Sequence, residues 1–183
     1  MAKRTIKPGS RQNEGGFTLI ELMITIIVLA ILTTAALPAF RSFIMSQRIK
    51  TASFDLMALL TFTRSEAIKR NANVTLGSDG AAFNTGANFL VTFGATTLKT
   101  QAMASGMQID CVNMTTRTYA ACPNGGITYA ANGRLTTTSG QAFPSGSPAL
   151  ELHPVNIAEI PDMYWRCITV DLSGRPNAKK GRC

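Results

Sequence analysis

Histidine is almost absent from this sequence, since His153 is the only one among 183 residues. A Ser-His-Asp triad needs a histidine as its base, and catalytic zinc sites commonly use two or three of them. The GxSxG, P-loop and HExxH motifs are also missing, and no spacing of the acids indicates a catalytic carboxylate pair. We therefore expect no enzyme activity, no catalytic residues, no metal and no cofactor.

Acidic residues are few as well, with 10 Asp and Glu against 18 Lys and Arg and a formal net charge of +8. The excess is unevenly spread. The first sixteen residues carry four cations against the single acid Glu14, whereas the rest of the chain keeps 14 cations against 9 acids, a net +5. Such a charge suits an anionic partner, for example nucleic acid or lipid headgroups, without requiring one.

The cysteines form no CxxC pair, and all four lie in the second half of the chain: Cys111, Cys122, Cys167 and Cys183. This pattern favours disulfides and an oxidising compartment, with a zinc site as the alternative. Three connectivities are open. We favour Cys111–Cys122 and Cys167–Cys183 because both bridges are then local. The second would enclose fifteen residues, which is worth about 3 kcal/mol in the chain-entropy model.

One long apolar stretch, FTLIELMITIIVLAILTTAALPAF, covers residues 17–40. Its Leu22–Leu37 section has sixteen residues without a charge, and the whole stretch is just long enough to cross a bilayer. In a secretory signal peptide the small-residue cleavage site follows the apolar run. Here the small pair, Gly15 and Gly16, precedes it. Cleavage at this pair would remove a basic leader, residues 1–16, and leave the anchor on the product.

The segment GGFTLIELMITIIVLAIL resembles the prepilin cleavage and anchor motif of type IV pilins and type II secretion pseudopilins. The glycine before the cut, the aromatic residue after it and a glutamate five residues into the mature chain all match. The resemblance implies that a membrane-embedded aspartyl prepilin peptidase cuts between Gly16 and Phe17 and methylates the new amine of Phe17. It also implies a single-pass inner-membrane protein with a periplasmic head, which later joins other pilin subunits in an extracellular pilus.

Glu21 lies near the start of the apolar run, where a carboxylate is costly, by about 2.5–3.5 kcal/mol for acids at mid-bilayer. Cleavage would create a positive amine on Phe17, four residues earlier. In a filament, that amine would meet Glu21 of the neighbouring subunit and set the register between helices. The alternative is a carboxylate that reaches up to the lipid headgroups.

Beyond Pro38, apolar residues recur at mostly helical spacing with cations between them. These residues are Phe40, Phe43, Ile44, Phe54, Met57, Leu60, Phe62 and Ile68. Pro38 lacks a backbone donor and should kink or interrupt a helix, but the pattern continues past it. We predict one helix over residues 17–71, about 80 Å long at 1.5 Å per residue. Residues 17–40 form its membrane or filament-core part, and residues 41–72 an amphipathic spine.

Short alternating runs, separated by Gly, Ser, Asn and Pro, follow Asn73 and predict strands. The runs are 74–77, 89–93, 107–112, 127–131, 149–153 and 165–172. Turn signals occur at 78–80, 124–126, 132–133 and 144–146. We expect an α+β fold in which antiparallel sheets over residues 73–183 pack on the spine helix. The segment RSEAIKRNANVTL, residues 64–76, resembles the junction of helix and first strand in the FimT/GspH group of minor pilins and pseudopilins.

The chain ends in a basic segment, in which Arg175, Lys179, Lys180 and Arg182 follow Asp171 with no further acid. A disulfide-closed loop that starts at Gly174 would hold these four cations together as a phosphate-binding surface. The alternative is a solvated basic tail without a partner.

The stretch LSGRP resembles the GRxR signature near the C-terminus of FimT proteins, minor pilins that bind DNA for uptake in natural transformation. Gly174 and Arg175 match its first two positions, and Asn177 stands where the second arginine would be. The resemblance implies binding of double-stranded DNA by these two residues, with Lys179, Lys180 and Arg182 adding cations. Binding would be weak, salt-dependent and independent of sequence, because nothing indicates a groove-reading helix.

Three functions remain open at this point. The chain is a DNA-binding minor pilin of a type IV pilus, a GspH-like minor pseudopilin of a type II secretion system, or a minor pilin that only primes pilus assembly. The anchor motif is common to all three. The clustered cations favour the first, because a subunit that contacts only proteins does not need them.

Overall fold

The computed structural model describes residues 16–113, 116–120, 122, 125–136, 149–155, 161–171 and 173–183. The chain divides into two compact units, Met1–Ser42 and Phe43–Cys183, and we call the second the head. Apart from Gly16, the expected leader lies outside the described residues, as does the turn expected at 144–146.

A single helix, α1, covers Leu19–Arg70, close to the predicted 17–71. Thr18 caps its first turn, because the Thr18 Oγ1 accepts a hydrogen bond from the backbone N of Glu21 at 3.2 Å. The helix ends where Asn71 adopts a φ of 50°, a left-handed conformation that asparagine tolerates and that commonly terminates helices. The local sequence therefore sets both ends of the helix.

The first part of α1 is apolar and its large side chains are exposed in the isolated chain, among them Ile24 and Leu29. The helix continues through Pro38. Among the described residues, no single helical segment is long and apolar enough to cross a membrane. One pair of segments joined at a bend, Leu19–Thr34 and Ala39–Arg70, meets the requirement by length and composition.

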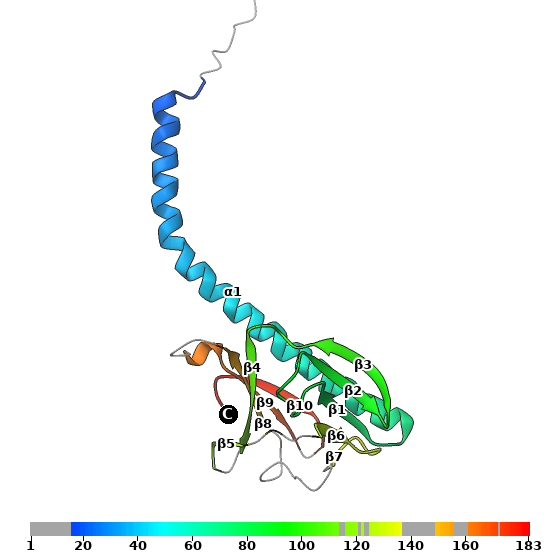
Figure 1. The fold of residues 1–183 in the computed structure, drawn as a ribbon. Coiled ribbons are helices and arrows are strands. Elements are labelled where there is room, and N and C mark those ends of the chain that lie inside the picture. Colours follow the sequence, from blue (N-terminus) through cyan, green and yellow to red (C-terminus); the bar gives the residue numbers. More distant parts are fainter. Residues whose placement is uncertain are drawn as a thin grey trace, which may run out of the picture. The chain divides into compact units, whose positions relative to one another are not determined.

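The head contains two antiparallel five-stranded sheets (Figure 1). The first has the order β3-β2-β1-β6-β7 and the second the order β10-β9-β8-β4-β5. The strands are β1 (Val74–Ser78), β2 (Asn88–Phe93), β3 (Thr96–Ala102), β4 (Met107–Asn113), β5 (Thr118–Ala120), β6 (Ile127–Tyr129), β7 (Leu135–Thr136), β8 (Ala149–Pro154), β9 (Arg166–Val170) and β10 (Pro176–Lys180), with a short 3-10 helix η1 (Asp162–Tyr164) before β9. A long helix packed with antiparallel sheets confirms the predicted α+β class.

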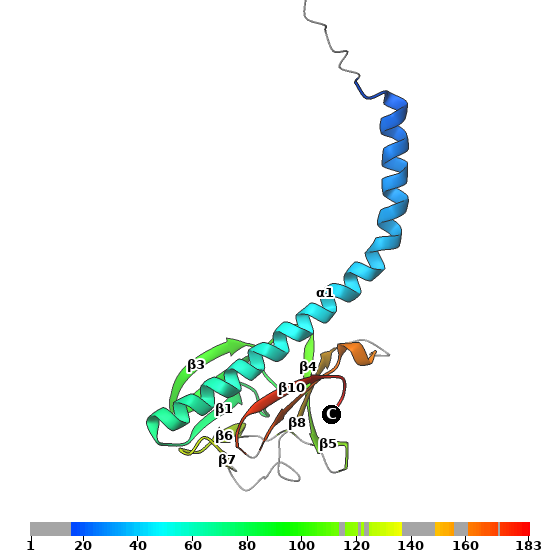
Figure 2. The same cartoon turned by 180° about the vertical axis from the view of Figure 1, so that it is seen from behind.

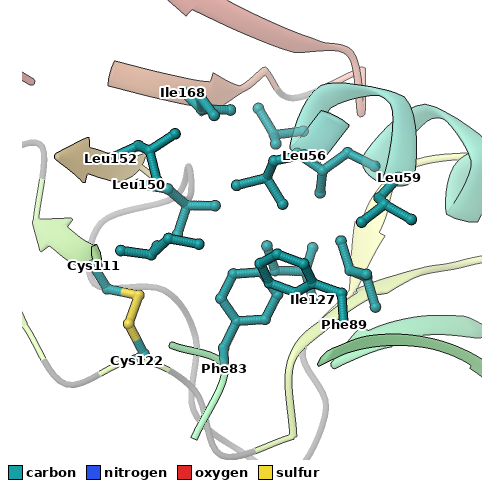
Figure 3. Close-up of a cluster of buried hydrophobic side chains, with 14 of the residues drawn as sticks. Leu56, Leu59, Phe83, Phe89, Cys111, Cys122, Ile127, Leu150, Leu152 and Ile168 are labelled. Carbon is teal, nitrogen blue, oxygen red and sulfur yellow. A yellow bond between two sulfur atoms is a disulfide. The ribbon is translucent and has the colours of Figure 1, made fainter. Parts of the chain in front are cut away.

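The hydrophobic core of the head joins α1 to both sheets. Figure 3 shows Leu56 and Leu59 of α1 converging with Ile127 of the first sheet and Leu150 and Ile168 of the second. The buried helix positions, including Ile49, Leu56, Leu60 and Ala67, recur at the helical period. Every residue of this core, the ten described strands and both disulfides belong to the head. We therefore expect a fragment from Arg41 onward to fold by itself.

The sequence predicted six strands, and the structure adds β3, β5, β7 and β10. All four lie at the edge of a sheet. Edge strands bury little of either face, so they need no alternation of apolar and polar residues. In β3, for example, most side chains are exposed. The missing strands are therefore those with the weakest sequence pattern.

Candidate nucleic-acid interface

The basic C-terminal segment is a strand rather than the expected loop. β10 pairs with β9 from Pro176↔Val170 to Lys180↔Arg166 and forms the edge of the second sheet (Figure 2). Proline is tolerated at the first position of an edge strand, which is where Pro176 lies. The hairpin fixes the backbone of the basic segment, so its cations have defined directions.

The two lysines of β10 point to opposite faces of the sheet, since side chains alternate along a strand. Lys179 is opposite Cys167 in the ladder, and Lys180 is opposite Arg166. Between them and the turn, Ala178 is opposite the buried Ile168 and packs against the core. Lys180 therefore shares the face of the core residues and Lys179 the outer face, although both lysines are exposed.

Arg175 ends the turn between β9 and β10. The backbone N of Asp171 donates to the Arg175 carbonyl oxygen at 3.0 Å, and the N of Gly174 donates to the Asp171 carbonyl oxygen at 2.9 Å. The Asp171 Oδ1 also accepts from the Ser173 hydroxyl at 2.7 Å and from the N of Arg175 at 2.9 Å. The hydrogen bond from Ser173, supported by the one from Arg175, lowers the pKa of the Asp171 carboxyl. Asp171 thus holds the turn together as a carboxylate.

Gly174 is buried and has a φ of 82°. A Cβ at this position would lie 2.0 Å from the Gly133 carbonyl oxygen. The same oxygen accepts a hydrogen bond from the Nε of Arg64 on α1 at 3.0 Å. The role of Gly174 in this structure is therefore close backbone contact, which places Arg175 next to the β6–β7 turn.

Arg182 differs from the other three cations because its guanidinium already has partners in the protein. Its Nη2 donates to the Tyr119 hydroxyl, and its Cζ lies 4.3 Å from the centroid of the Trp165 ring. Its Nε is 3.9 Å from an oxygen of Glu151, which is only 3% exposed. The hydrogen bond to Tyr119 raises the pKa of Arg182. These contacts cover one face of the guanidinium and tie it to the sheet.

The disulfides join Cys111 to Cys122 and Cys167 to Cys183, the local pairing that the sequence favoured. The second bridge fastens the C-terminal residue to β9. There, the backbone N of Cys183 donates to the Glu151 Oε1, while the Tyr119 hydroxyl donates to the Glu151 Oε2 at 3.2 Å. The buried carboxylate of Glu151 is thereby satisfied by residues from β5 and from the C-terminus.

At the other end of the chain, the residues of the expected processing site lie around the start of α1. Gly16 precedes the helix and meets no atom that would exclude a side chain. Phe17 is 82% exposed, and Glu21 is exposed in the first turn. The cleavage of this segment and the pairing of Glu21 with a neighbouring subunit stay predictions.

His153 is a structural residue in β8. Its Nε2 lies 2.8 Å from the Asp110 Oδ2, and its ring centroid is 4.3 Å from that of Trp165. Within the part of the chain that the structure describes, no group of three or more His, Cys, Asp or Glu residues could hold a metal ion. The contacts of Tyr119 and Trp165 with Arg182 have no local sequence signal, because these residues are distant in the chain.

Two family models match the chain. The prokaryotic N-terminal methylation motif matches residues 11–37, and the type II transport protein GspH matches residues 52–159. No curated protein matches in sequence.

Among solved structures, the type IV minor pilin FimU of Pseudomonas aeruginosa is similar, with 14% identity and a TM-score of 0.51 over 73% of this chain and 89% of FimU. The minor pseudopilin EpsH of the type 2 secretion system of Vibrio cholerae has 14% identity and a TM-score of 0.47 over 73% of this chain and 97% of EpsH. At this identity, the likeness to FimU shows the fold alone.

The GspH model covers more than half of the chain. The methylation motif adds a hydrophobic helix that fits anchoring in the inner membrane before assembly. Proteins of this kind are structural subunits rather than enzymes, and they associate with other pilins after processing by a prepilin peptidase. A closer relation to FimT than to other members stays a prediction. The chain belongs to the GspH family, and it is a minor pilin or pseudopilin of a type IV pilus or a type II secretion system.

Proposed function

We propose that the chain is a minor pilin of a type IV pilus that binds double-stranded DNA during DNA uptake, through Arg175, Lys179 and Lys180 of the β9–β10 hairpin. One observation carries the proposal. The three cations are exposed on one hairpin at a sheet edge, and among the described residues none of them forms an ion pair with an acid.

The geometry of β10 suits a phosphate backbone. A five-residue strand is about 17 Å long, and each DNA strand carries a charge about every 3.4 Å. Lys179 and Lys180 lie on opposite faces of the sheet at the edge that β10 forms. A DNA backbone that runs along this edge can therefore contact both lysines. Contacts of this kind carry no sequence information. The proposed binding is therefore electrostatic and independent of sequence.

The same lysines have an alternative role, which is protection against aggregation. Lysines on an edge strand discourage pairing with another sheet, which limits aggregation.

A second function is also supported, because the matched GspH model describes a type II transport protein. That match ends at residue 159, before the basic hairpin, so it does not bear on the cations. DNA binding by the head separates these readings.

The test uses the head fragment 41–183 and a fluorescent DNA duplex, with anisotropy measured across a salt series. If three phosphate contacts form, the slope of log K against log salt is about −2.7. Arg175→Ala, Lys179→Ala and Lys180→Ala should each reduce the size of this slope by about one. Arg48→Ala removes the same charge from an exposed position on α1 and should leave the slope unchanged.

Arg182→Ala provides a contrast within the same segment. It should lower the free energy of unfolding by about 1–2 kcal/mol, through the lost hydrogen bond and cation–π contact, and leave the salt slope close to the wild-type value. Absence of DNA binding by a folded, oxidised wild-type head at low salt would refute the proposal and favour the pseudopilin or priming role.

We further propose that the prepilin peptidase cuts between Gly16 and Phe17, and that Glu21 pairs with the new amine of a neighbouring subunit. Gly16→Glu should leave the leader attached, which mass spectrometry of the membrane fraction detects. Glu21→Ala should permit cleavage and methylation but reduce the amount of subunit in sheared filaments, because the buried amine loses its partner. Normal processing of Gly16→Glu would contradict the cleavage site, and normal incorporation of Glu21→Ala would contradict the pairing.

A further inference from the structure

Two turns of the head share one construction. In the β6–β7 turn, the N of Ala130 donates to the Arg134 carbonyl oxygen and the N of Gly133 to the Ala130 carbonyl oxygen, both at 2.8 Å. The β9–β10 turn repeats these two bonds at the same spacing, with Asp171, Gly174 and Arg175 in the corresponding places. The two glycines have φ values of 72° and 82°. Each turn is therefore a hairpin connection with a left-handed glycine followed directly by an arginine.

The two turns, which come from different sheets, touch at their glycines. The Cβ position of Gly174 lies 2.0 Å from the Gly133 carbonyl oxygen, so only a glycine at position 174 permits this approach. Arg134 and Arg175 each directly follow one of these glycines, and consecutive Cα atoms are 3.8 Å apart. The Cα atoms of the two arginines therefore lie within about 10 Å of each other. Arg134 is exposed, as is Arg175. The contact between the two glycines is thus flanked by two exposed arginines, one in each turn.

A third cation and one acid lie at this contact among the described residues. Arg64 of α1 donates from its Nε to the Gly133 carbonyl oxygen, which brings a third positive charge to the turns. Asp171 is the acid of the second turn, and its Oδ1 already accepts two hydrogen bonds within that turn. Tyr129 also lies at this contact, since its Cε1 is 3.1 Å from the Cβ position of Gly174. It is fully buried, and its hydroxyl has no hydrogen-bond partner among the described residues. Burial raises its pKa, so it adds no negative charge.

We propose that the paired Gly-Arg turns form a phosphate clamp, in which Arg134 of the β6–β7 turn and Arg175 of the β9–β10 turn contact the DNA backbone together. The clamp rests on the proposed function and adds a residue from outside the C-terminal segment. Guanidinium groups suit this task because their planar fork binds two phosphate oxygens at once. The glycine contact fixes the spacing of the arginines, so little ordering is needed when DNA binds.

The first test compares Arg134→Ala, Arg175→Ala and the double variant in the head fragment, using the same duplex and salt series. Each single variant should reduce the size of the salt slope by about one, and the double variant by about two. Arg134→Lys should restore the slope but not the full affinity, because an ammonium cannot bind two oxygens in the same way. Arg48→Ala again serves as the matched control. An unchanged slope in Arg134→Ala would overturn the clamp while leaving DNA binding by β10 intact.

The second test separates the clamp from DNA binding. Inorganic pyrophosphate is titrated into the isotope-labelled head, and amide shifts are followed by NMR. The amides of Gly133, Arg134, Gly174 and Arg175 should move together in the wild type and stay fixed in the double variant. If these amides respond but the wild type does not bind DNA, the two turns form a phosphate site that does not take up DNA, and the proposed function is wrong. If pyrophosphate shifts no amide of the two turns, the clamp is wrong whatever the DNA result.

Discussion

Gly174→Ala should lower the free energy of unfolding of the head by more than about 2 kcal/mol. The substituted residue would have to keep a φ of 82°, which costs a non-glycine residue free energy, and its Cβ would lie 2.0 Å from the Gly133 carbonyl oxygen. That oxygen also accepts a hydrogen bond from the Nε of Arg64, and a shift of the Gly133 backbone would strain or break this bond. Urea unfolding of the head fragment measures the change.

Gly94→Ala is the matched control for this variant. Gly94 also has a positive φ, 56°, but no atom lies within 4 Å of its Cβ position. Its substitution should cost only the backbone term, about 1–2 kcal/mol. If both variants lose the same stability, the contact between the two glycines contributes nothing and the spacing of Arg134 and Arg175 is not fixed by it.

The parts of the fold that depend on local sequence were predicted well. The ends of α1 were placed within two residues, and the structure gives each end a local cause, the Thr18 cap at its start and the left-handed Asn71 at its end. Both disulfides were expected from the short separations of their cysteines. Strands whose residues are mostly buried, such as β8 and β9, showed enough apolar residues to be recognised. Each of these features is determined by a short stretch of chain.

β10 was missed because its pattern is dominated by polar residues. Pro176 and Lys179 are uncommon in strands, and the two glycine-containing ends suggested a loop. Its pairing partner β9 and the disulfide at its end stabilise it as an edge strand. The consequence for the candidate site is substantial, since a strand sends Lys179 and Lys180 to opposite faces, whereas a loop leaves their directions open.

The sequence did not identify Arg134, and it did not separate Arg182 from the other cations. Arg182 contacts Tyr119, 63 residues away, and Gly174 contacts Gly133 in the other sheet, so neither relation has a local signal. One weak signal was present. The chain contains Asn-Gly-Arg and Ser-Gly-Arg, each between strands, and such turns place the glycine in a left-handed conformation. Similar turns predict similar backbone geometry, but only the structure shows that they touch.

Removing the Cys167–Cys183 bridge, by Cys167→Ser with Cys183→Ser, should lower the free energy of unfolding by about 3 kcal/mol. The bridge lowers the conformational entropy of the unfolded chain, and it also holds the last residues against the sheet. Without it, the N of Cys183 and the guanidinium of Arg182 are no longer kept beside Glu151, so a carboxylate that is 3% exposed loses partners. Urea unfolding measures the global loss, and amide exchange along β10 measures the local one.

The control is Cys111→Ser with Cys122→Ser. This bridge closes a separation of 11 residues rather than 16, and its cysteines are part of the buried core, so its removal should also be destabilising. The two double variants should differ in the amide exchange of β10, because only the Cys167–Cys183 bridge fastens the chain just after this strand. When the two variants are compared under conditions of equal global stability, the β10 amides should exchange faster in the Cys167/Cys183 variant. If β10 exchanges equally fast in both variants, the ladder with β9 holds the hairpin without help from the disulfide, and the cations keep their positions under reducing conditions.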